Sequence, residues 1–251
     1  MSKSLTSNPK GGYRFLPGGY PYCSGVVAEP GYEIVHVTLA HPLPWREGLD
    51  SVRRSLESIG CERHALCGVE LRCPEPFSME GFIEFNKGYR AVLEEWDMLV
   101  DGENPVARTN VAPVSDPPSE SLVHGFSYTE PSEMTRPTFV VAGAGELSHR
   151  DIEEQHIVRL GETSEDAILE KANCVVEIMR LRLAALGAKE EHLSTIDVYA
   201  AHPLQRALAE AVIPGLPAAA GLGVRWFYSR PPVRDIEFEM DMRGVRRDIV
   251  L

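Results

Sequence analysis

Residues 104–111, which read Asn104-Pro105-Val106-Ala107-Arg108-Thr109-Asn110-Val111, set one arginine between a proline turn and a strand rich in β-branched side chains. The planar guanidinium of arginine carries five N–H donors in a fixed arrangement, which suits a carboxylate. A surface arginine in a turn, paired with a nearby acid, would look the same in this octapeptide alone. The rest of the chain is needed to choose between the two interpretations.

The composition is that of an ordinary soluble globular protein. The 251 residues are 43% hydrophobic and 25% charged, and the length suits one large domain or two of about 120 residues. The net charge is −12, with 25 basic residues scattered among 37 acidic ones. This balance argues against a nucleic-acid partner, which requires clustered Lys and Arg. An anionic substrate would need a local basic pocket.

The sequence shows no signal for membrane, metal or nucleotide binding. Residues 1–10 are polar, and no stretch approaches the roughly 18 apolar residues of a membrane span, so we expect a cytoplasmic protein. The five cysteines include no Cys-x-x-Cys pair, and His36 and His41 have no third ligand at metal spacing. Residues 143–145 lack the further Gly or Lys of a phosphate loop. We therefore expect neither a metal nor a cofactor.

The same order of predicted elements occurs twice, at an offset of roughly 115 to 130 residues. Each copy reads strand, helix, strand, helix, strand, strand. In the first half these are residues 20–27, 48–60, 65–72, 81–96, 108–114 and 121–129. In the second half they are residues 138–145, 164–187, 194–201, 203–212, 221–229 and 235–243.

This repeat predicts an α+β fold of two tandem domains, each a mixed sheet with two helices on one face, because amphipathic helices bury their apolar side against a sheet. Pro131 and Pro137 interrupt regular structure between the copies. We therefore predict an N-terminal domain over residues 1–130, a linker over 131–137 and a C-terminal domain over 138–251.

Four short motifs, in this order and spacing, resemble one protein family. They are Ser24-Gly25, Phe85-Asn86-Lys87-Gly88-Tyr89, Asn104-Pro105-x-x-Arg108 and Ile236-Glu237-Phe238-Glu239. The family is Rid (reactive intermediate deaminase, or YjgF), and the resemblance covers nearly the whole chain as two tandem halves. It implies two chorismate-mutase-like domains and a homotrimer with pockets at domain or subunit interfaces. The doubled form, with Arg230-Pro231-Pro232-Val233, more narrowly resembles the 2-amino-5-chloromuconate deaminases of aromatic degradation.

The chain departs from the family pattern by dividing its key residues between the halves. The first half has Arg108 and Asn86, but its last strand, residues 122–126, contains no acid. The second half has Glu237, but residues 217–222 contain no arginine. A pocket built from unlike halves would join Arg108 and Asn86 to Gly143 and Glu237. The alternative is that one half has degenerated and is inert.

The resemblance implies cofactor-independent hydrolysis of an enamine or imine dicarboxylate such as 2-aminomuconate or 2-amino-5-chloromuconate, with release of ammonia and formation of the 2-hydroxymuconate or its 2-oxo form. Arg108 would hold the carboxylate next to the reacting carbon. Glu237 would orient and deprotonate the water. Asn86 and backbone N–H groups near Ser24 or Gly143 would position polar atoms of the substrate.

A second carboxylate requires another cation, for which Arg72 and Arg225 are the candidates on predicted strands. Each could equally form a structural ion pair. His124 stands where the family has an acid and is a candidate proton donor, although a buried structural histidine is the alternative. Trp226 could shield the diene or simply pack in the core.

Two other functions are compatible with the same residues. A chorismatase-like enzyme would also act on a dicarboxylate and would consume chorismate instead of aminomuconates. A non-catalytic small-molecule binding module would make the division of Arg108 and Glu237 a sign of decay. Measurement of ammonia release from an aminomuconate distinguishes the three.

Overall fold

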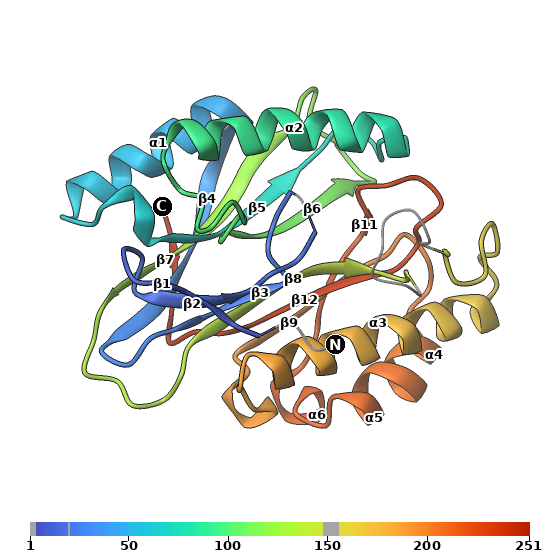
Figure 1. Cartoon of the computed structure of the whole chain (residues 1–251). Coiled ribbons are helices and arrows are strands. Elements are labelled where there is room, and N and C mark those ends of the chain that lie inside the picture. Colours follow the sequence, from blue (N-terminus) through green and yellow to red (C-terminus); the bar gives the residue numbers. More distant parts are fainter. Residues whose placement is uncertain (1–3, 20, 148–155) are drawn as a thin grey trace.

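Two β-sheets lie face to face between two outer layers of helices (Figure 1). The computed structural model describes residues 4–19, 21–147 and 156–251. The six-stranded sheet has the order β11 (Ser229–Arg230), β6 (Ala107–Pro113), β5 (Leu66–Arg72), β7 (Leu122–Pro131), β4 (Tyr32–Pro44) and β13 (Arg247–Val250). Helices α1 (Trp45–Ser58) and α2 (Met79–Glu95) cover its outer face.

The second sheet has seven strands. Their order is β1 (Thr6–Asn8), β2 (Tyr13–Leu16), β3 (Gly25–Ala28), β8 (Phe139–Gly145), β12 (Glu239–Gly244), β9 (Thr195–Tyr199) and β10 (Arg225–Phe227). Its outer face carries α3 (Glu165–Ala185) and the short helices α4 (Gln205–Ala207), α5 (Ile213–Gly215) and α6 (Ala219–Leu222), with a π-helical turn over Leu208–Val212. Two 3-10 turns, Arg63–Ala65 and Glu190–His192, precede β5 and β9.

The internal repeat is visible in the strand pairing. In the six-stranded sheet, four consecutive strands come from the first half, in the order β6-β5-β7-β4. In the seven-stranded sheet, four consecutive strands come from the second half, in the order β10-β9-β12-β8. In both, the first pair is parallel and the next two pairs are antiparallel. The predicted α+β class, with mixed sheets and helices on one face, is confirmed.

The first strand of the first repeat differs from the prediction. The counterpart of β8 is β4. Among the described residues of the predicted strand, 21–27, the strand that forms is β3, which pairs with β2 and β8 in the other sheet. The prediction relied on the break at Gly25 and overlooked β4, whose buried residues 33–37 include Glu33 and His36. The predicted strand 221–229 also begins as helix α6 and turns at Gly223, where φ is 84°.

The two halves exchange strands at their edges. Strands β1, β2 and β3 come from the first half but extend the sheet of the second. Strands β11 and β13 come from the second half but extend the sheet of the first. The connection between β7 and β8 runs over residues 132–138. The domain limits at residues 130 and 138 remain a prediction, and each half depends on strands from the other.

Three hydrophobic clusters hold the layers together. One lies between α3 and the seven-stranded sheet, and a second between α1, α2 and the six-stranded sheet. The third lies between the sheets around Tyr13, Phe15 and Ile34. Burial of each such side chain contributes roughly 1.5–3 kcal/mol.

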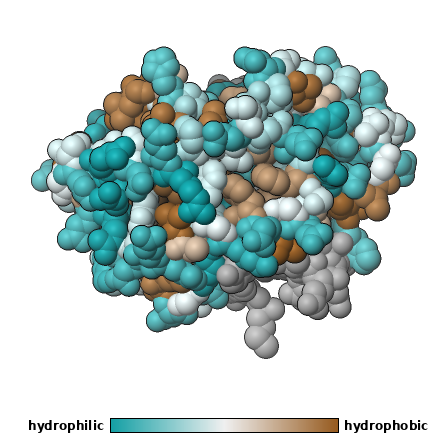
Figure 2. Space-filling view, turned by 90° about the horizontal axis from the view of Figure 1, so that it is seen from above, coloured by the Kyte–Doolittle hydropathy of each residue, from teal (hydrophilic) through white to brown (hydrophobic). Residues whose placement is uncertain are grey.

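The face above α1 and α2 is largely hydrophilic, with separate small hydrophobic patches (Figure 2). Within residues 4–19, 21–147 and 156–251, no helix is both long and apolar enough to cross a membrane.

Candidate functional site

Arg108 projects from β6 toward α2 and is almost completely buried, with 3% of its surface exposed. Its Nη2 donates to Oδ1 of Asn86, a buried residue of α2, over 2.5 Å. Its Nη1 has no hydrogen-bond partner among the described residues. The part of the chain that the structure describes also provides no carboxylate paired with this guanidinium.

Four aromatic rings surround the Arg108 guanidinium. Its Cζ lies 4.6 Å from the ring centre of Tyr89 and 4.8 Å from that of Tyr22. The rings of Phe82 and Phe85 are 5.6 and 5.7 Å away. Burial lowers the pKa of Arg108, although a guanidinium stays charged at neutral pH. A buried cation without a carboxylate is unfavourable by itself, so this site suits an external anion.

Local sequence explains how this aromatic site forms. Ser78 caps α2 by accepting the Gly81 N–H at 3.1 Å, and Phe82, Phe85, Asn86 and Tyr89 then follow at helical spacing toward β6.

Asn104 fixes the other side of the site. Its Oδ1 accepts the Val106 N–H at 2.9 Å, and its Nδ2 donates to the Pro21 carbonyl at 2.7 Å. The Asn104-Pro105 motif thus ties the segment that carries Tyr22 to the start of β6.

Gly143 lies where the two sheets meet, next to Thr109 of β6. Its N–H donates to Thr109 Oγ1 at 3.1 Å, so this group is already occupied. A Cβ at residue 143 would collide with the Glu239 carboxyl group and press on the Thr109 side chain. Burial, and next the charge of Asp241, raise the pKa of Glu239 well above its usual range. The glycine therefore makes room for a buried carboxyl group whose pKa is raised.

Glu237 lies in a different environment, just before β12. Its Oε2 is 2.8 Å from His202 Nε2 and 3.5 Å from Arg230 Nη1. The Glu237 and His202 side chains are 14% and 19% exposed, so the pair can be reached from solvent. Among the described residues, no hydrogen bond or ion pair joins Glu237 to Arg108.

A buried ion pair holds the backbone at Glu237. Glu146 and Lys171 are 3.0 Å apart, and neither side chain has exposed surface. The Glu146 carboxylate also accepts the N–H of Glu237 at 2.7 Å and that of Phe238 at 3.0 Å. These bonds fix the backbone of the two residues before β12, and with it the position from which the Glu237 side chain projects.

Two predicted substrate-binding residues are engaged elsewhere. Arg225 makes two bonds of 2.6 Å to the Asp197 carboxylate, as a structural ion pair would. The Trp226 indole donates to the Ala200 carbonyl at 3.0 Å, and 46% of its surface is exposed.

Ser24 lies beside the second sheet. Its N–H donates to the Leu16 carbonyl at 2.8 Å and its carbonyl accepts the Ala142 N–H at 3.2 Å. Its backbone N–H is therefore committed to the fold.

Arg72 and His124 lie between the sheets. Arg72 is buried, its Nη1 donates to its neighbour Leu71, and its Nη2 has no hydrogen-bond partner in the described ranges. Its Cζ is 5.7 Å from the rings of Tyr199 and Phe227. Burial, followed by the charge of Arg72, lowers the pKa of His124 to about 4, so the imidazole is neutral at pH 7. Arg72 Nη2 also lies 3.7 Å from Glu70 Oε2, so Arg72, like Arg225, already faces a carboxylate of the fold.

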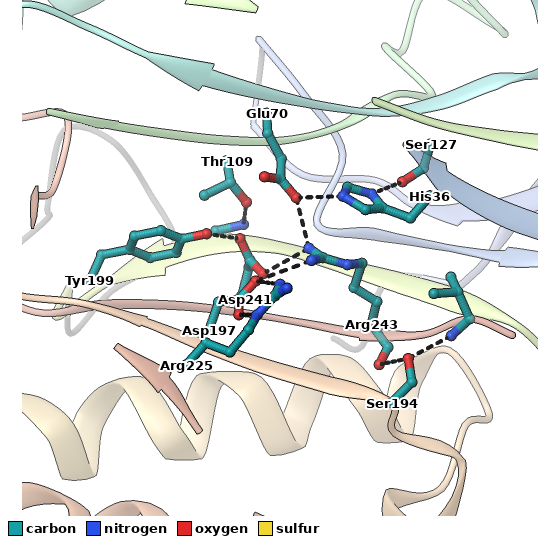
Figure 3. Close-up of polar contacts among 12 residues, drawn as sticks. His36, Glu70, Thr109, Ser127, Ser194, Asp197, Tyr199, Arg225, Asp241 and Arg243 are labelled. Carbon is teal, nitrogen blue, oxygen red and sulfur yellow. Dashed lines mark hydrogen bonds and ion pairs between the residues drawn. The ribbon is translucent and has the colours of Figure 1, made fainter. Parts of the chain in front are cut away.

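A polar network crosses the interface between the sheets (Figure 3). Arg243 on β12 lies 2.7 Å from Glu70 and 3.3 Å from Asp197. Tyr199 donates to Asp241 Oδ2 at 2.9 Å, and His36 Nε2 lies 3.5 Å from Glu70. Although burial alone would raise it, Arg243 holds the pKa of Glu70 below its usual range. The adjacent cavity of about 10 Å³ has room for about one water molecule.

Several of these residues were not predicted as site residues. His202 and Tyr22 gave no signal in the sequence, because each contacts a residue far away in the chain. The alternation of charged and apolar residues over 237–243 did contain a signal, since it predicts one polar face of a strand. Within the described ranges, no group of three or more His, Cys, Asp or Glu side chains is placed to hold a metal ion.

Comparison with known proteins gives close sequence matches and distant structural ones. Residues 5–249 match the family described as 2-aminomuconate deaminase CnbZ. The 2-amino-5-chloromuconate deaminase of Comamonas testosteroni is 38% identical over 254 residues, which span 100% of both chains.

Among solved structures, a chorismatase has a TM-score of 0.46 and 10% identity over 96% of this chain and 79% of its own. The YjgF gene product of E. coli has a TM-score of 0.29 and 18% identity over 44% of this chain and 81% of its own. Neither likeness identifies a substrate.

Proposed function

The chain belongs to the 2-aminomuconate deaminase CnbZ family, and we propose that it hydrolyses 2-aminomuconate or 2-amino-5-chloromuconate with release of ammonia. We also propose that the protein is a cytoplasmic, cofactor-independent enzyme of aromatic degradation. The relative that is 38% identical is a deaminase of the chlorinated compound. Because that relative and this chain match over their full lengths, a substrate of the same chemical type is the natural proposal.

The observation that best supports this proposal is that Nη1 of Arg108 has no hydrogen-bond partner among the described residues. The guanidinium is buried among four rings, and Asn86 holds one end of it. A substrate carboxylate that accepts from Nη1 would supply the missing partner, in a charge-assisted bond worth roughly 1.5–3 kcal/mol. The surrounding rings offer apolar contact to a conjugated carbon chain.

The reaction requires a proton donor and a base. Protonation of a substrate carbon converts the enamine to an imine, water adds to the imine carbon, and the carbon–nitrogen bond then breaks as ammonia leaves. Glu239, whose pKa is raised by burial, is suited to donate the first proton. Glu237, beside His202, is suited to deprotonate the water, which is worth about 10²–10⁴ in rate.

The separation of Arg108 from Glu237 supports an assembled enzyme in which a neighbouring copy completes the site. Glu237 belongs to a partly exposed group with His202 and Arg230. Trp226 and Tyr228, in the segment before Arg230, are 46% and 51% exposed. We propose a homotrimer in which this second-half surface faces the Arg108 pocket of another copy. A head-to-tail interface of this kind closes by cyclic symmetry.

Incubation of the purified protein with 2-aminomuconate and with its 5-chloro analogue, while ammonia is measured, tests the proposal. We expect ammonia release with either compound. Chorismate serves as the comparison substrate, and its consumption without deamination of the aminomuconates would contradict the proposal. A protein that binds these compounds and turns over none of them would be a binding module.

A further inference from the structure

Asn110 is a buried amide that has no partner. Only 3% of its surface is exposed, and neither Oδ1 nor Nδ2 makes a hydrogen bond to any described residue. Leaving a buried polar group unsatisfied costs about 1–3 kcal/mol. Buried side-chain amides are nearly always bonded, so two unpaired atoms on one side chain require an explanation.

Strand geometry places Asn110 on the same face of β6 as Arg108. Side chains two residues apart on a strand point the same way, with their Cα atoms roughly 6.6 Å apart. In the parallel pairing with β5, Val69 is opposite Arg108 and Leu71 is opposite Asn110. Val69 and Leu71 belong to the cluster under α1 and α2, whereas Thr109 contacts the other sheet. Asn110 therefore faces the helix layer, beside the Arg108 pocket.

We propose that Asn110 binds the amino nitrogen of the aminomuconate while Arg108 binds the carboxylate on the adjacent carbon. This inference rests on the proposed function. The Oδ1 of Asn110 accepts an N–H of the substrate. After hydrolysis an oxygen replaces the nitrogen, and Nδ2 can donate to it if the amide turns over.

The neutral charge of the amide matters as much as its hydrogen bonds. An Asp or Glu at position 110 would also accept an N–H, but it would repel a substrate with two carboxylates. It would also pair with the Arg108 guanidinium and remove the group that binds the carboxylate. An amide accepts from the amine without either effect, so position 110 can distinguish amino-substituted muconates from unsubstituted muconate.

The test compares Asn110→Leu with Asn104→Leu. Leucine has nearly the shape of asparagine but forms no hydrogen bonds. Asn104 is the matched control, because it is equally buried but both ends of its amide are bonded within the fold. The Kd values of 2-aminomuconate and of cis,cis-muconate, which has no amino group, are measured by calorimetry in proteins that all carry Glu237→Gln, so that turnover is too slow to disturb the titration. The Tm of each variant is measured without ligand.

For Asn110→Leu we expect 2-aminomuconate to bind about tenfold more weakly, the effect of one lost hydrogen bond, and muconate to bind within about twofold of wild type. The Tm should stay the same or rise, because the substitution removes unpaired polar atoms from a buried position. Asn104→Leu should lower the Tm. A structural role for Asn110 predicts the reverse, namely a lower Tm and equal effects on both ligands.

Equal weakening of both ligands, or no weakening of either, would overturn the role of Asn110. Failure of the wild-type protein to release ammonia would instead overturn the proposed function. The two binding titrations need no turnover, so they decide the role of Asn110 in either case.

Discussion

At the scale of single residues, Arg108 tests whether the pocket recognises a carboxylate. Arg108→Lys keeps the charge but loses the planar group that reaches both Asn86 and an added anion. We expect a higher KM and a kcat/KM lower by roughly 10- to 150-fold, the effect of one charge-assisted bond. Arg108→Ala should lose more, and Arg53→Lys on the exposed face of α1 should have no effect. Unchanged kcat/KM in both Arg108 variants would exclude its role.

Glu237 tests the assignment of the base. Glu237→Gln keeps the shape and the contact with His202 but removes the basic oxygen. We expect kcat to fall by about 10²–10⁴ with KM little changed, because the loss falls on the chemical step. Stopped-time ammonia measurements at saturating substrate give kcat directly.

Glu239→Gln is the comparison for Glu237. If Glu239 supplies the carbon-bound proton, its loss should also lower kcat. Full activity in Glu237→Gln together with inactivity in Glu239→Gln would transfer the role of base to the buried residue. The exposed Glu210→Gln should behave as wild type.

At the scale of elements, the sequence predicted the repeated pattern better than the partners of each strand. Helix α2 and strand β6 were predictable because Phe82, Phe85 and Tyr89 show helical spacing and Arg108 begins a β-branched run. Strand β4 was missed because Glu33 and His36 interrupt its apolar pattern. His36 is buried against Ser127 on β7 and Glu70 on β5, and Glu33 is paired with Arg247 on β13. Such non-local pairing is not encoded in local periodicity.

For the same reason, the sequence alone could not predict how the environments of Glu237 and Glu239 differ. The two acids alternate with Phe238, so both fit a polar face. Their environments differ because Gly143 on β8 leaves space for one, while His202 and Arg230 contact the other. The sequence placed Arg108 and Asn86 together because each belongs to a recognisable motif, and the structure joins them by a hydrogen bond.

Asp241 on strand β12 leads to a prediction of how the stability of the protein depends on pH. Burial, followed by the charges of Asp197 and Glu70, raises the pKa of Asp241 to about 7 in the folded protein. The folded state therefore binds this proton more tightly than the unfolded chain, whose Asp has a pKa of about 3.9. The stabilisation is complete below about pH 4 and is lost as the pH rises through about 7.

We expect the free energy of unfolding of wild type, relative to Asp241→Asn, to fall between about pH 4 and about pH 8, by up to about 1.4 kcal/mol per pH unit in the steepest part. Urea unfolding of both proteins across this range measures it. The comparison isolates Asp241, because Glu70 and His36 titrate in both proteins. A difference that is constant with pH, or that grows as the pH rises, would show that Asp241 is ionised throughout.

At the scale of the whole molecule, the two halves are interlocked but chemically unlike. The first supplies the buried cation in an aromatic pocket, and the second supplies the exposed Glu237–His202 pair. The exchange of edge strands ties the halves into one body, so neither is expected to fold alone. The remaining question is whether the cation and the base of one active site come from one chain or from two.

Mixing two inactive variants answers that question. Arg108→Ala keeps an intact second half, and Glu237→Gln keeps an intact first half. If sites form between chains of a cyclic trimer, random co-refolding of equal amounts joins two intact halves at about one quarter of the interfaces, so about one quarter of wild-type ammonia release should return. If Arg108 and Glu237 act within one chain, every site contains one defect and mixing restores nothing. Light scattering of the wild-type protein supplies the independent check, because a monomer has no neighbouring copy to complete the site and would exclude the trimer.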